Sequence, residues 1–503
     1  MAVPVSICKA GGIYFVEFDT PGSSVNIFSR ATAEQIHQFM QQLQPNDASL
    51  VVFKSAKPYS FLNGTELVLT ASAHTFEDAI TLSEPTRQAY RAIEQCPIPT
   101  VSAIQGSCFG CGVEFALCTD YRLAADSFDT CFYMTELKDY YFPPIFGALE
   151  KLPRLLGLCG AVDFLLWGEK WRPVEAHARN LIDRVLPGDD FDSSLGGFLS
   201  SGALKALPKR PVLECPAPAS ANEAADCDQI RHRIGRLPAE QRGLYGLCFE
   251  AMLESLRNPY SRQFVRKSTA AFRSVFESDA WRKATTFFFT RTMARAASLG
   301  TSSLIPSDPV TLRLPATALE CVRIFGGGRL RGLTVHRDET VARPELIGKN
   351  AVLHPFDVRW GYAGDVRSDA RPLLYFPGGE SCDVCEVFMA PESLQEFRSL
   401  LVLITHLGWQ PIVRSIDGKS ALNVLIDAGM HGLWQVHREA QHLLRTKVLR
   451  HSSQVDVAVC ALFNFPLCRG SFMSHFEGTS RDKRADHRRG GRDRPGHRPS
   501  IPC

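Results

Sequence analysis

The sequence of 503 residues lacks any run of the roughly 20 apolar residues that a membrane-spanning helix needs. Its first residues, MAVPVSICKAGGIYFVEF, lack the basic start and long apolar core of a secretory signal. It also lacks a strong charge imbalance, because the formal net charge is only +3. Bulk charge therefore indicates no nucleic-acid partner, and nothing indicates a membrane. We expect a soluble protein of the cytoplasm.

The cysteines lack the pattern of a metal site or a disulfide framework. The 16 cysteines are scattered among apolar neighbours along a chain of ordinary globular composition. This distribution favours buried, reduced thiols. Two CxxC pairs occur, Cys108 with Cys111 and Cys382 with Cys385. Neither pair has further ligands at the spacing that zinc sites use, so we predict no metal.

The most informative stretch runs from Ile98 to Thr119 and reads IPTVSAIQGSCFGCGVEFALCT. Its pattern predicts a strand, a sharp turn and a helix. Gly110 and Gly112 flank Cys111, which allows close backbone packing and leaves main-chain N–H groups available at the N-terminus of the helix. Aligned peptide dipoles favour negative charge at such a turn, which can therefore hold an anion.

Two glutamates accompany this turn. Glu114 falls in the first turn of the expected helix, and Glu136 follows 22 residues later. A cradle for negative charge beside two carboxylates indicates acid/base chemistry on a carbonyl compound.

The segment from Ile98-Pro99-Thr100-Val101 to Asp120-Tyr121-Arg122 resembles the signature of the crotonase (enoyl-CoA hydratase/isomerase) superfamily. It is similar in particular to the N-terminal half of multifunctional fatty-acid oxidation enzymes, in which a hydratase is fused to a 3-hydroxyacyl-CoA dehydrogenase. A second segment, Ser55 to Leu67, resembles another characteristic stretch of that superfamily. The resemblance implies an α/β fold of the ClpP/crotonase type, a spiral of ββα units, over residues 1–190.

The resemblance also implies roles for individual residues. In the crotonase fold, the residue after a loop glycine donates one backbone N–H to the thioester oxygen, and that glycine is Gly64, so the donor is Thr65. The turn residue three before the first glutamate donates the other N–H, which places this role on Cys111. The family usually has glycine there, so the cysteine side chain must point away from the acyl group. Glu114 and Glu136 match the two glutamates of the hydratases.

These parts suit the addition of water to a conjugated thioester. The reaction puts negative charge on the carbonyl oxygen, where two preorganised N–H donors stabilise it. Two carboxylates can divide the proton transfers if their environments separate their pKa values. A lone glutamate is ordinarily a solvated surface residue, and only the coincidence with both loop segments sets these two apart.

Further residues are expected to line the substrate site. Pro143 follows Glu136 at the spacing seen in the family, and Tyr140, Tyr141 and Phe142 replace smaller residues. These aromatic side chains either narrow the acyl pocket or pack in the core. The expected substrate-binding residues are Gly64, Gly110, Gly112, Phe142 and Pro143.

The chain after residue 190 changes character. The stretch from Pro208 to Ala225 is rich in Pro, Ala and Ser and reads as a connection. Apolar residues recur at helical spacing from Ala239 to Ala297. We therefore expect residues 191–310 to form a linker and a helical region.

Residues 311–449 resemble a degenerate, Rossmann-like 3-hydroxyacyl-CoA dehydrogenase region. A dinucleotide site needs a helix after its glycines and an acidic residue about 20 positions further on. Here a strand-like run starts at Leu333, and Asp338 comes only 12 residues after Gly326. Leu373 stands where the resemblance places the catalytic histidine, while Glu386 matches its partner. We predict that NAD binding and dehydrogenase activity are lost.

Residues 450–503 form a basic tail. The segment from Arg481 to Arg498 holds eight Lys or Arg against three Asp and cannot bury a core, so we expect disorder. Either the tail binds nucleic acid or an acidic surface, or it results from an altered reading frame, and the abrupt change in composition favours the altered reading frame.

Together these features predict an enoyl-CoA hydratase of fatty-acid or related acyl metabolism that acts on a CoA or carrier-protein thioester and needs no other cofactor. Double-bond isomerisation is the second reading. A non-catalytic thioester-binding or scaffold protein is the alternative from another class. The resemblance implies a homotrimer or a complex with a thiolase-like partner, and we expect no membrane or nucleic-acid partner.

Overall fold

The computed structural model describes residues 3–286, apart from residues 24, 67–71, 128, 208–211, 215–217, 219–221, 259–260 and 278. Beyond that part it describes the backbone of eight short strands between residues 310 and 415 and portions of residues 421–476.

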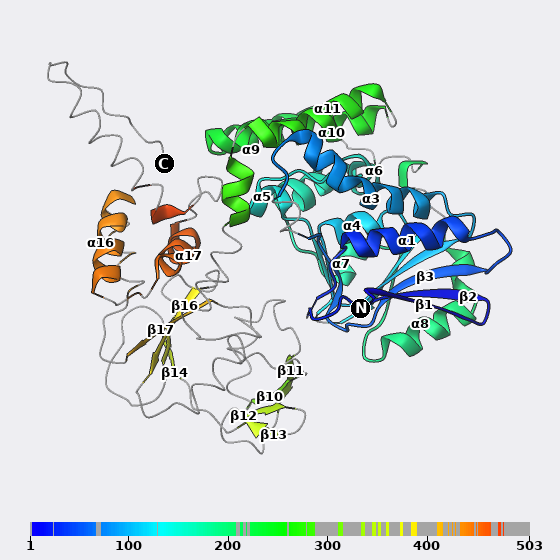
Figure 1. Ribbon diagram of the computed structural model, residues 1–503, viewed down its shortest axis with the longest axis horizontal. Coiled ribbons are helices and arrows are strands. Elements are labelled where there is room, and N and C mark those ends of the chain that lie inside the picture. The colour runs from blue at the N-terminus through cyan, green and yellow to red at the C-terminus, as the bar shows by residue number, and fades with distance from the viewer. Residues whose placement is uncertain are drawn as a thin grey trace.

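Two sheets organise the N-terminal part of the chain (Figure 1). The larger sheet has the order β1-β2-β3-β5-β7-β9, and all of its neighbouring pairs except β1 with β2 are parallel. Its strands are β1 (Val5–Ala10), β2 (Ile13–Phe18), β3 (Leu50–Ser55), β5 (Thr100–Ile104), β7 (Tyr121–Asp126) and β9 (Arg184–Pro187). The smaller sheet is parallel and consists of β4 (Ser60–Asn63), β6 (Ser107–Phe109) and β8 (Cys131–Tyr133).

The chain repeats one unit three times. A strand of the larger sheet is followed by a strand of the smaller sheet and then by a helix, first as β3, β4 and α3 (Phe76–Glu94). The second unit is β5, β6 and α4 (Cys111–Ala116), and the third is β7, β8 and α5 (Glu136–Tyr140). This spiral of ββα units confirms the predicted fold class.

The stretch around Gly106 differs from the single strand that we predicted there. The chain leaves β5, turns at Gly106 with φ +78°, and enters β6 in the other sheet. A Cβ atom at Gly106 would collide with the backbone of Tyr59 and Ser60. The glycine therefore permits a sheet-to-sheet crossing that an apolar pattern alone does not reveal.

Both faces of the larger sheet are covered, because alternate strand residues point to opposite sides. Val51 and Phe53 pack in one core cluster with helix α1 (Arg30–Gln42), whereas Leu50 and Val52 pack in another with α8 (Phe191–Ser200). Figure 1 shows α1 and α8 on opposite sides of the strands. The boundary predicted at residue 190 thus cuts through a core, since α8 is part of it.

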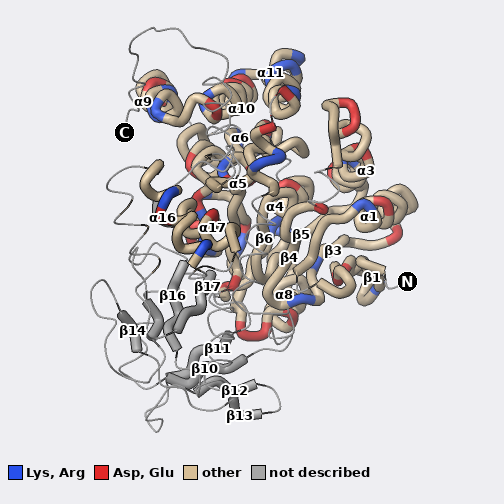
Figure 2. The backbone as a smooth tube through the Cα atoms, turned by 60° about the vertical axis from the view of Figure 1, so that its left-hand side comes forward, with Lys and Arg blue, Asp and Glu red and all other residues tan. Residues whose placement is uncertain are grey.

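The helices after residue 200 complete the same core rather than forming a separate unit. Tyr245 and Phe249 of α10 and Phe264 of α11 belong to the cluster that also holds the α1 side of the sheet. Figure 2 shows acidic and basic residues along α9, α10 and α11, whereas β4, β5 and β6 are uncharged. The remaining helices described up to residue 286 are α6 (Ala148–Ala161), α7 (Pro173–Ala178), α9 (Glu223–Gly235), α10 (Ala239–Arg257) and α11 (Arg262–Ser274), together with the short π-helix η1 (Val162–Leu166) and the short 3-10 helices η2 (Ala203–Ala206), η3 (Val212–Glu214) and η4 (Val275–Glu277).

The strands between residues 310 and 415 form two mixed sheets of four strands each. Each sheet contains antiparallel pairs, whereas dinucleotide-binding folds are mostly parallel. The predicted glycine run at residues 326–328 lies outside the described residues, and the strand expected from Leu333 is present. The Rossmann-like interpretation stays a prediction. The strands are β10 (Val310–Leu314), β11 (Leu333–Arg337), β12 (Glu345–Gly348), β13 (Ala351–Leu353), β14 (Arg359–Gly361), β15 (Leu373–Tyr375), β16 (Val384–Met389) and β17 (Gln410–Ser415).

After the strands the structure describes the helices α16 (Leu433–Arg445) and α17 (Ser452–Phe463). Val436 and Ala440 of α16 share a buried cluster with Val455 and Val459 of α17. The basic tail predicted from residue 450 therefore begins later, because an apolar helix occupies its first part. The charged segment at residues 481–498 lies outside the described residues. Within the described parts, no helix combines the length and apolarity needed to cross a membrane.

Candidate active site

The predicted site residues follow the ends of the three strands of the smaller sheet. Asn63 of β4 is in register with Phe109 of β6, and Phe109 with Tyr133 of β8. Because the strands are parallel, the residues after each strand meet at one edge of the sheet. Thr65 comes two residues after β4, and both Cys111 and Glu136 come shortly after β6 and β8. The fold thus brings three distant predicted residues to one edge.

Glu114 lies in the first turn of α4 and is only 3% exposed. Its Oε1 accepts hydrogen bonds from the backbone N–H of Phe146 at 2.8 Å and of Ala148 at 3.1 Å. Burial raises the pKa of Glu114 to about 7, against the lowering effect of these hydrogen bonds and of the Lys151 charge. Among the residues that the structure describes, both hydrogen bonds fall on Oε1, which leaves Oε2 for a reacting group.

Glu136 is the first residue of α5, and its Oε2 is a buried atom with no hydrogen-bond partner within the described chain. Burial, together with the neighbouring negative charge of Glu114, raises the pKa of Glu136 to about 8. A buried carboxyl oxygen without a partner is uncommon in folded proteins and calls for a specific explanation. Here it lies at the edge where the other predicted residues gather.

Two backbone N–H groups at this edge, those of Thr65 and Cys111, have no acceptor among the residues that the structure describes. Cys111 is the first residue of α4, so its N–H has no partner within the helix, and no other described residue accepts it. At Thr65 the preceding carbonyl, that of Gly64, accepts from Phe28 N at 3.0 Å. The Gly64 carbonyl and the Thr65 N–H belong to the same trans peptide group and therefore point in opposite directions. Because the carbonyl points towards Phe28, the Thr65 N–H points away from it. The Cys111 side chain is 5% exposed and packs in the main core cluster.

The glycines of the site are required by close approaches. Gly110 has φ +59°, and a Cβ atom there would collide with Oε1 of Glu136. At Gly112 a Cβ atom would collide with the carbonyl of Leu62 in β4. Gly64 has φ +73°, and its N–H donates to the Phe109 carbonyl at 3.1 Å. The turn therefore holds β4, β6 and the Glu136 carboxylate against one another.

Residues 9–196 match the family model described as enoyl-CoA hydratase/isomerase. This segment belongs to the enoyl-CoA hydratase/isomerase (crotonase) superfamily. The resemblance seen in the sequence is thereby confirmed for the ββα part of the chain, which we call the hydratase/isomerase segment, residues 9–196.

Similar proteins carry related names. The fatty acid oxidation complex subunit alpha of Aliivibrio fischeri is 31% identical over 202 residues, which is 40% of this chain and 29% of that protein. The chain thus spans less than a third of that relative's length. Among solved structures, an enoyl-CoA hydratase from Bacillus halodurans is 18% identical and covers 56% of this chain and 99% of its own, with a TM-score of 0.40. An enoyl-CoA hydratase/carnithine racemase from Magnetospirillum magneticum is 22% identical and covers 48% and 91%, with a TM-score of 0.38.

The two residues expected to line an acyl pocket of the hydratase/isomerase segment lie after α5. Phe142 has its ring centroid 5.6 Å from that of Phe272 and 5.9 Å from that of Trp281. Phe142 therefore packs in an aromatic cluster with the helical region. Of the two roles considered for this side chain, narrowing an acyl pocket or packing in the core, the contacts agree with core packing. Pro143 is buried.

Sequence reasoning missed three contributors to the site. The N–H groups of Phe146 and Ala148 come from the end of the loop before α6 and from the first residue of that helix, and no side-chain pattern reveals their position. The Tyr90 hydroxyl on α3 donates to the Cys111 carbonyl at 2.6 Å and so helps to hold the turn of residues 110–112 in place. Lys151 is a buried cation on α6, and its presence on an otherwise apolar helix face is the one signal that could have revealed it.

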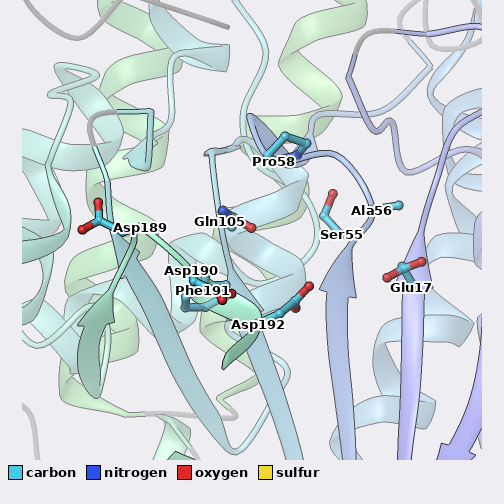
Figure 3. A pocket seen from close by; sticks show the side chains of 9 residues that line it. All are labelled: Glu17, Ser55, Ala56, Pro58, Gln105, Asp189, Asp190, Phe191 and Asp192. Carbon is cyan, nitrogen blue, oxygen red and sulfur yellow. The ribbon is translucent and has the colours of Figure 1, made fainter. Parts of the chain in front are cut away.

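A cavity of about 400 Å³ lies elsewhere, at the ends of strands in the larger sheet (Figure 3). Its lining includes the carboxylates of Glu17, Asp189, Asp190 and Asp192, and none of the predicted site residues borders it. An acidic lining repels the phosphates of CoA. In the described residues, no three metal-binding side chains gather at one point, and the cysteines whose side chains are described are free thiols.

The raised carboxyl pKa values predict a stability that falls as the pH rises. Between an ordinary value of 4.5 and about 8, folded Glu136 retains a proton that the unfolded chain has lost. The folded state then binds more protons, so the free energy of unfolding decreases with pH. We expect Glu136→Gln to unfold with a free energy at least about 1.4 kcal/mol higher than wild type at pH 8.5, the equivalent of one pKa unit.

Urea unfolding at pH 5 and pH 8.5 measures this difference. The extra free energy of unfolding of Glu136→Gln should be smaller at pH 5 than at pH 8.5, because Glu136 in the folded wild type is protonated at pH 5. The exposed Glu34 provides the control, since Glu34→Gln should give no pH-dependent gain. Equal stabilities of wild type and Glu136→Gln at both pH values would contradict a raised pKa.

Proposed function

We propose that the protein hydrates 2-enoyl thioesters, or dehydrates the 3-hydroxyacyl products, with acyl-CoA as the substrate class. The observation that carries this proposal is the pairing of two buried carboxyl groups with two available backbone N–H groups at one sheet edge. The N–H groups of Thr65 and Cys111 would stabilise negative charge on the thioester oxygen as water adds to the double bond.

The two glutamates would divide the proton transfers. Glu114 carries two N–H donors on Oε1, which favour its carboxylate form, so it would accept a proton from water through Oε2. Glu136 has the higher pKa, about 8, and would hold a proton at neutral pH to donate to the carbon next to the carbonyl. This separation is what one site needs to run acid and base steps together.

Two other functions are tested by the same assay. Double-bond isomerisation moves a proton between two carbons and can proceed with one acid/base group, so the presence of two carboxyl groups favours hydration. A non-catalytic thioester-binding protein would keep the N–H groups but show no turnover.

The test is turnover of crotonyl-CoA by the purified full chain, followed as loss of the conjugated thioester absorbance. A 3-enoyl-CoA substrate serves as the comparison, because isomerisation would create that absorbance. The proposal predicts loss with crotonyl-CoA. Gain with the 3-enoyl substrate and no loss with crotonyl-CoA would favour the isomerase, and binding with neither change would favour the non-catalytic protein.

We also propose that the region after residue 310 contributes no dehydrogenase activity. The spacing of Asp338 after Gly326 leaves too little chain for the helix that would receive the pyrophosphate of NAD. Titration calorimetry of the full chain with NAD should give no heat of binding. A dissociation constant in the micromolar range would contradict this expectation.

A further inference from the structure

Lys151 is a buried cation that the proposed reaction does not use. It lies on α6 and is 5% exposed. Its Nζ forms an ion pair with Oε1 of Glu94 on α3 and lies 3.3 Å from Sγ of Cys118. A lysine removed from water is costly unless its charge is paired, so this arrangement needs a reason beyond packing.

The backbone connects Lys151 to the loop that holds Glu114. Lys151 N donates to the Gly147 carbonyl at 2.9 Å. Gly147 stands between Phe146 and Ala148, the two residues whose N–H groups bind the Glu114 carboxylate. The lysine side chain also covers this loop, because a Cβ atom at Gly147 would lie 3.4 Å from Lys151 Cε and 3.5 Å from Nζ.

A second connection runs through Cys118. Its thiol donates to the carbonyl of Glu114 at 3.2 Å, and its sulfur is the atom that Lys151 Nζ approaches. Lys151 therefore contacts both Cys118, which follows α4 and is bonded to the Glu114 carbonyl, and Gly147, which stands between the two N–H donors of the Glu114 carboxylate.

The charges around Glu114 come from several elements. Lys151 on α6 is a cation that acts on Glu114 and favours its carboxylate form. Glu136 on α5 is a second acid at the same edge, and Glu94 on α3 faces the lysine. The Tyr90 hydroxyl and the thiols of Cys111 and Cys118 are also close enough for the Glu114 charge to act on them.

We propose that Lys151 is a positioning residue that holds residues 146–148, at the N-terminus of α6, against the Glu114 carboxyl group. The inference deepens the proposed hydration, since it rests on Glu114 acting as the base. Glu94 keeps the lysine buried by pairing with it from α3. Removal of the cation leaves Glu114 protonated over a wider pH range, so the base becomes available only at higher pH.

The pH dependence of kcat/KM for crotonyl-CoA separates this role from a merely structural one. An opposite charge close to a carboxyl group shifts its pKa by about one unit or more. Lys151→Met should move the acid limb of the profile up by about one pH unit, a loss of about tenfold at pH 6. Lys151→Arg keeps a positive charge and should therefore show the same acid limb of the kcat/KM profile as wild type. Lys54→Met removes a lysine that pairs with Glu17 and Asp192 away from the site, and it should leave the limb unmoved.

An infrared titration of the protonated carboxyl band gives a readout that does not need activity. The band that disappears in Glu114→Gln is assigned to Glu114, and its midpoint should rise by about one unit in Lys151→Met. Glu94→Gln retains Lys151, so the titration midpoint of Glu114 should not rise. This variant provides the comparison with wild type if Lys151→Met does not fold. An unchanged midpoint in Lys151→Met, or an equal rise in Glu94→Gln, would overturn the proposal. If wild type turns over no thioester, the proposed hydration fails while this titration still tests Lys151.

Discussion

Glu114→Gln lowers kcat for crotonyl-CoA hydration by about 10²-fold to 10⁴-fold, the range expected when a general base is removed. Glutamine keeps an oxygen that can accept the N–H groups of Phe146 and Ala148, so the loop around the side chain is retained. An amide cannot take a proton from water at neutral pH, so only the chemical step should suffer. Steady-state kinetics at pH 8, where wild-type Glu114 is ionised, measure the effect.

The control for this variant is Glu34→Gln on α1, which removes a glutamate exposed at the surface. A surface change of this kind should leave both rate and stability close to wild type. If the purified protein binds the thioester and wild type and Glu114→Gln turn it over at equal rates, Glu114 is not the base.

Gly110→Ala should reduce kcat by about 10²-fold to 10³-fold, comparable with the loss of one donor to an oxyanion. Gly110 has φ +59°, a conformation that alanine adopts only with strain of about 1–3 kcal/mol. The added Cβ atom would also displace the Glu136 carboxyl group, whose Oε1 occupies that space. Both the Cys111 N–H and the Glu136 carboxyl group would then be displaced. The loss of kcat should therefore be larger than the strain at Gly110 alone explains.

Kinetics and thermal unfolding of the same preparation separate the two effects. Gly246→Ala on α10 is the matched control, because no atom lies within 4 Å of the added Cβ and its φ is not positive. That variant should keep full activity and gain about 0.4–1 kcal/mol of stability, as expected when alanine replaces glycine in a compatible conformation. Full activity in Gly110→Ala would show that this turn does not shape the site.

The local parts of the site could be predicted because they are encoded in neighbouring residues. The spacing of Gly110, Cys111 and Gly112 before an apolar helical pattern gives both the turn and the place of Glu114 in the first turn of α4. Glu136 was noted as a second carboxylate after the turn, whereas its match to the second hydratase glutamate and the role of Thr65 come from the family resemblance. The structure explains their convergence through the parallel register of β4, β6 and β8.

The parts that sequence reasoning missed depend on contacts between distant segments. The ring of Phe142 packs on Phe272, 130 residues away, so its environment is set by the helical region. Lys151 meets Glu94 of another helix, and a single buried lysine leaves no periodic pattern. In the sequence, β5 and β6 around Gly106 look like one continuous strand. The need for glycine there comes from the backbone of Tyr59 and Ser60, which is distant in the sequence and leaves no room for a side chain.

The claim on which the proposed function depends is that the Thr65 and Cys111 N–H groups bind the thioester oxygen. Isotope-edited infrared spectroscopy reads this directly, with crotonyl-CoA labelled at the carbonyl carbon and bound to Glu114→Gln, which holds the substrate without converting it. We expect a carbonyl stretching frequency below that of free crotonyl-CoA, and a return towards the free value when the Gly110→Ala change is added to Glu114→Gln. A bound carbonyl with the frequency of free crotonyl-CoA would contradict it.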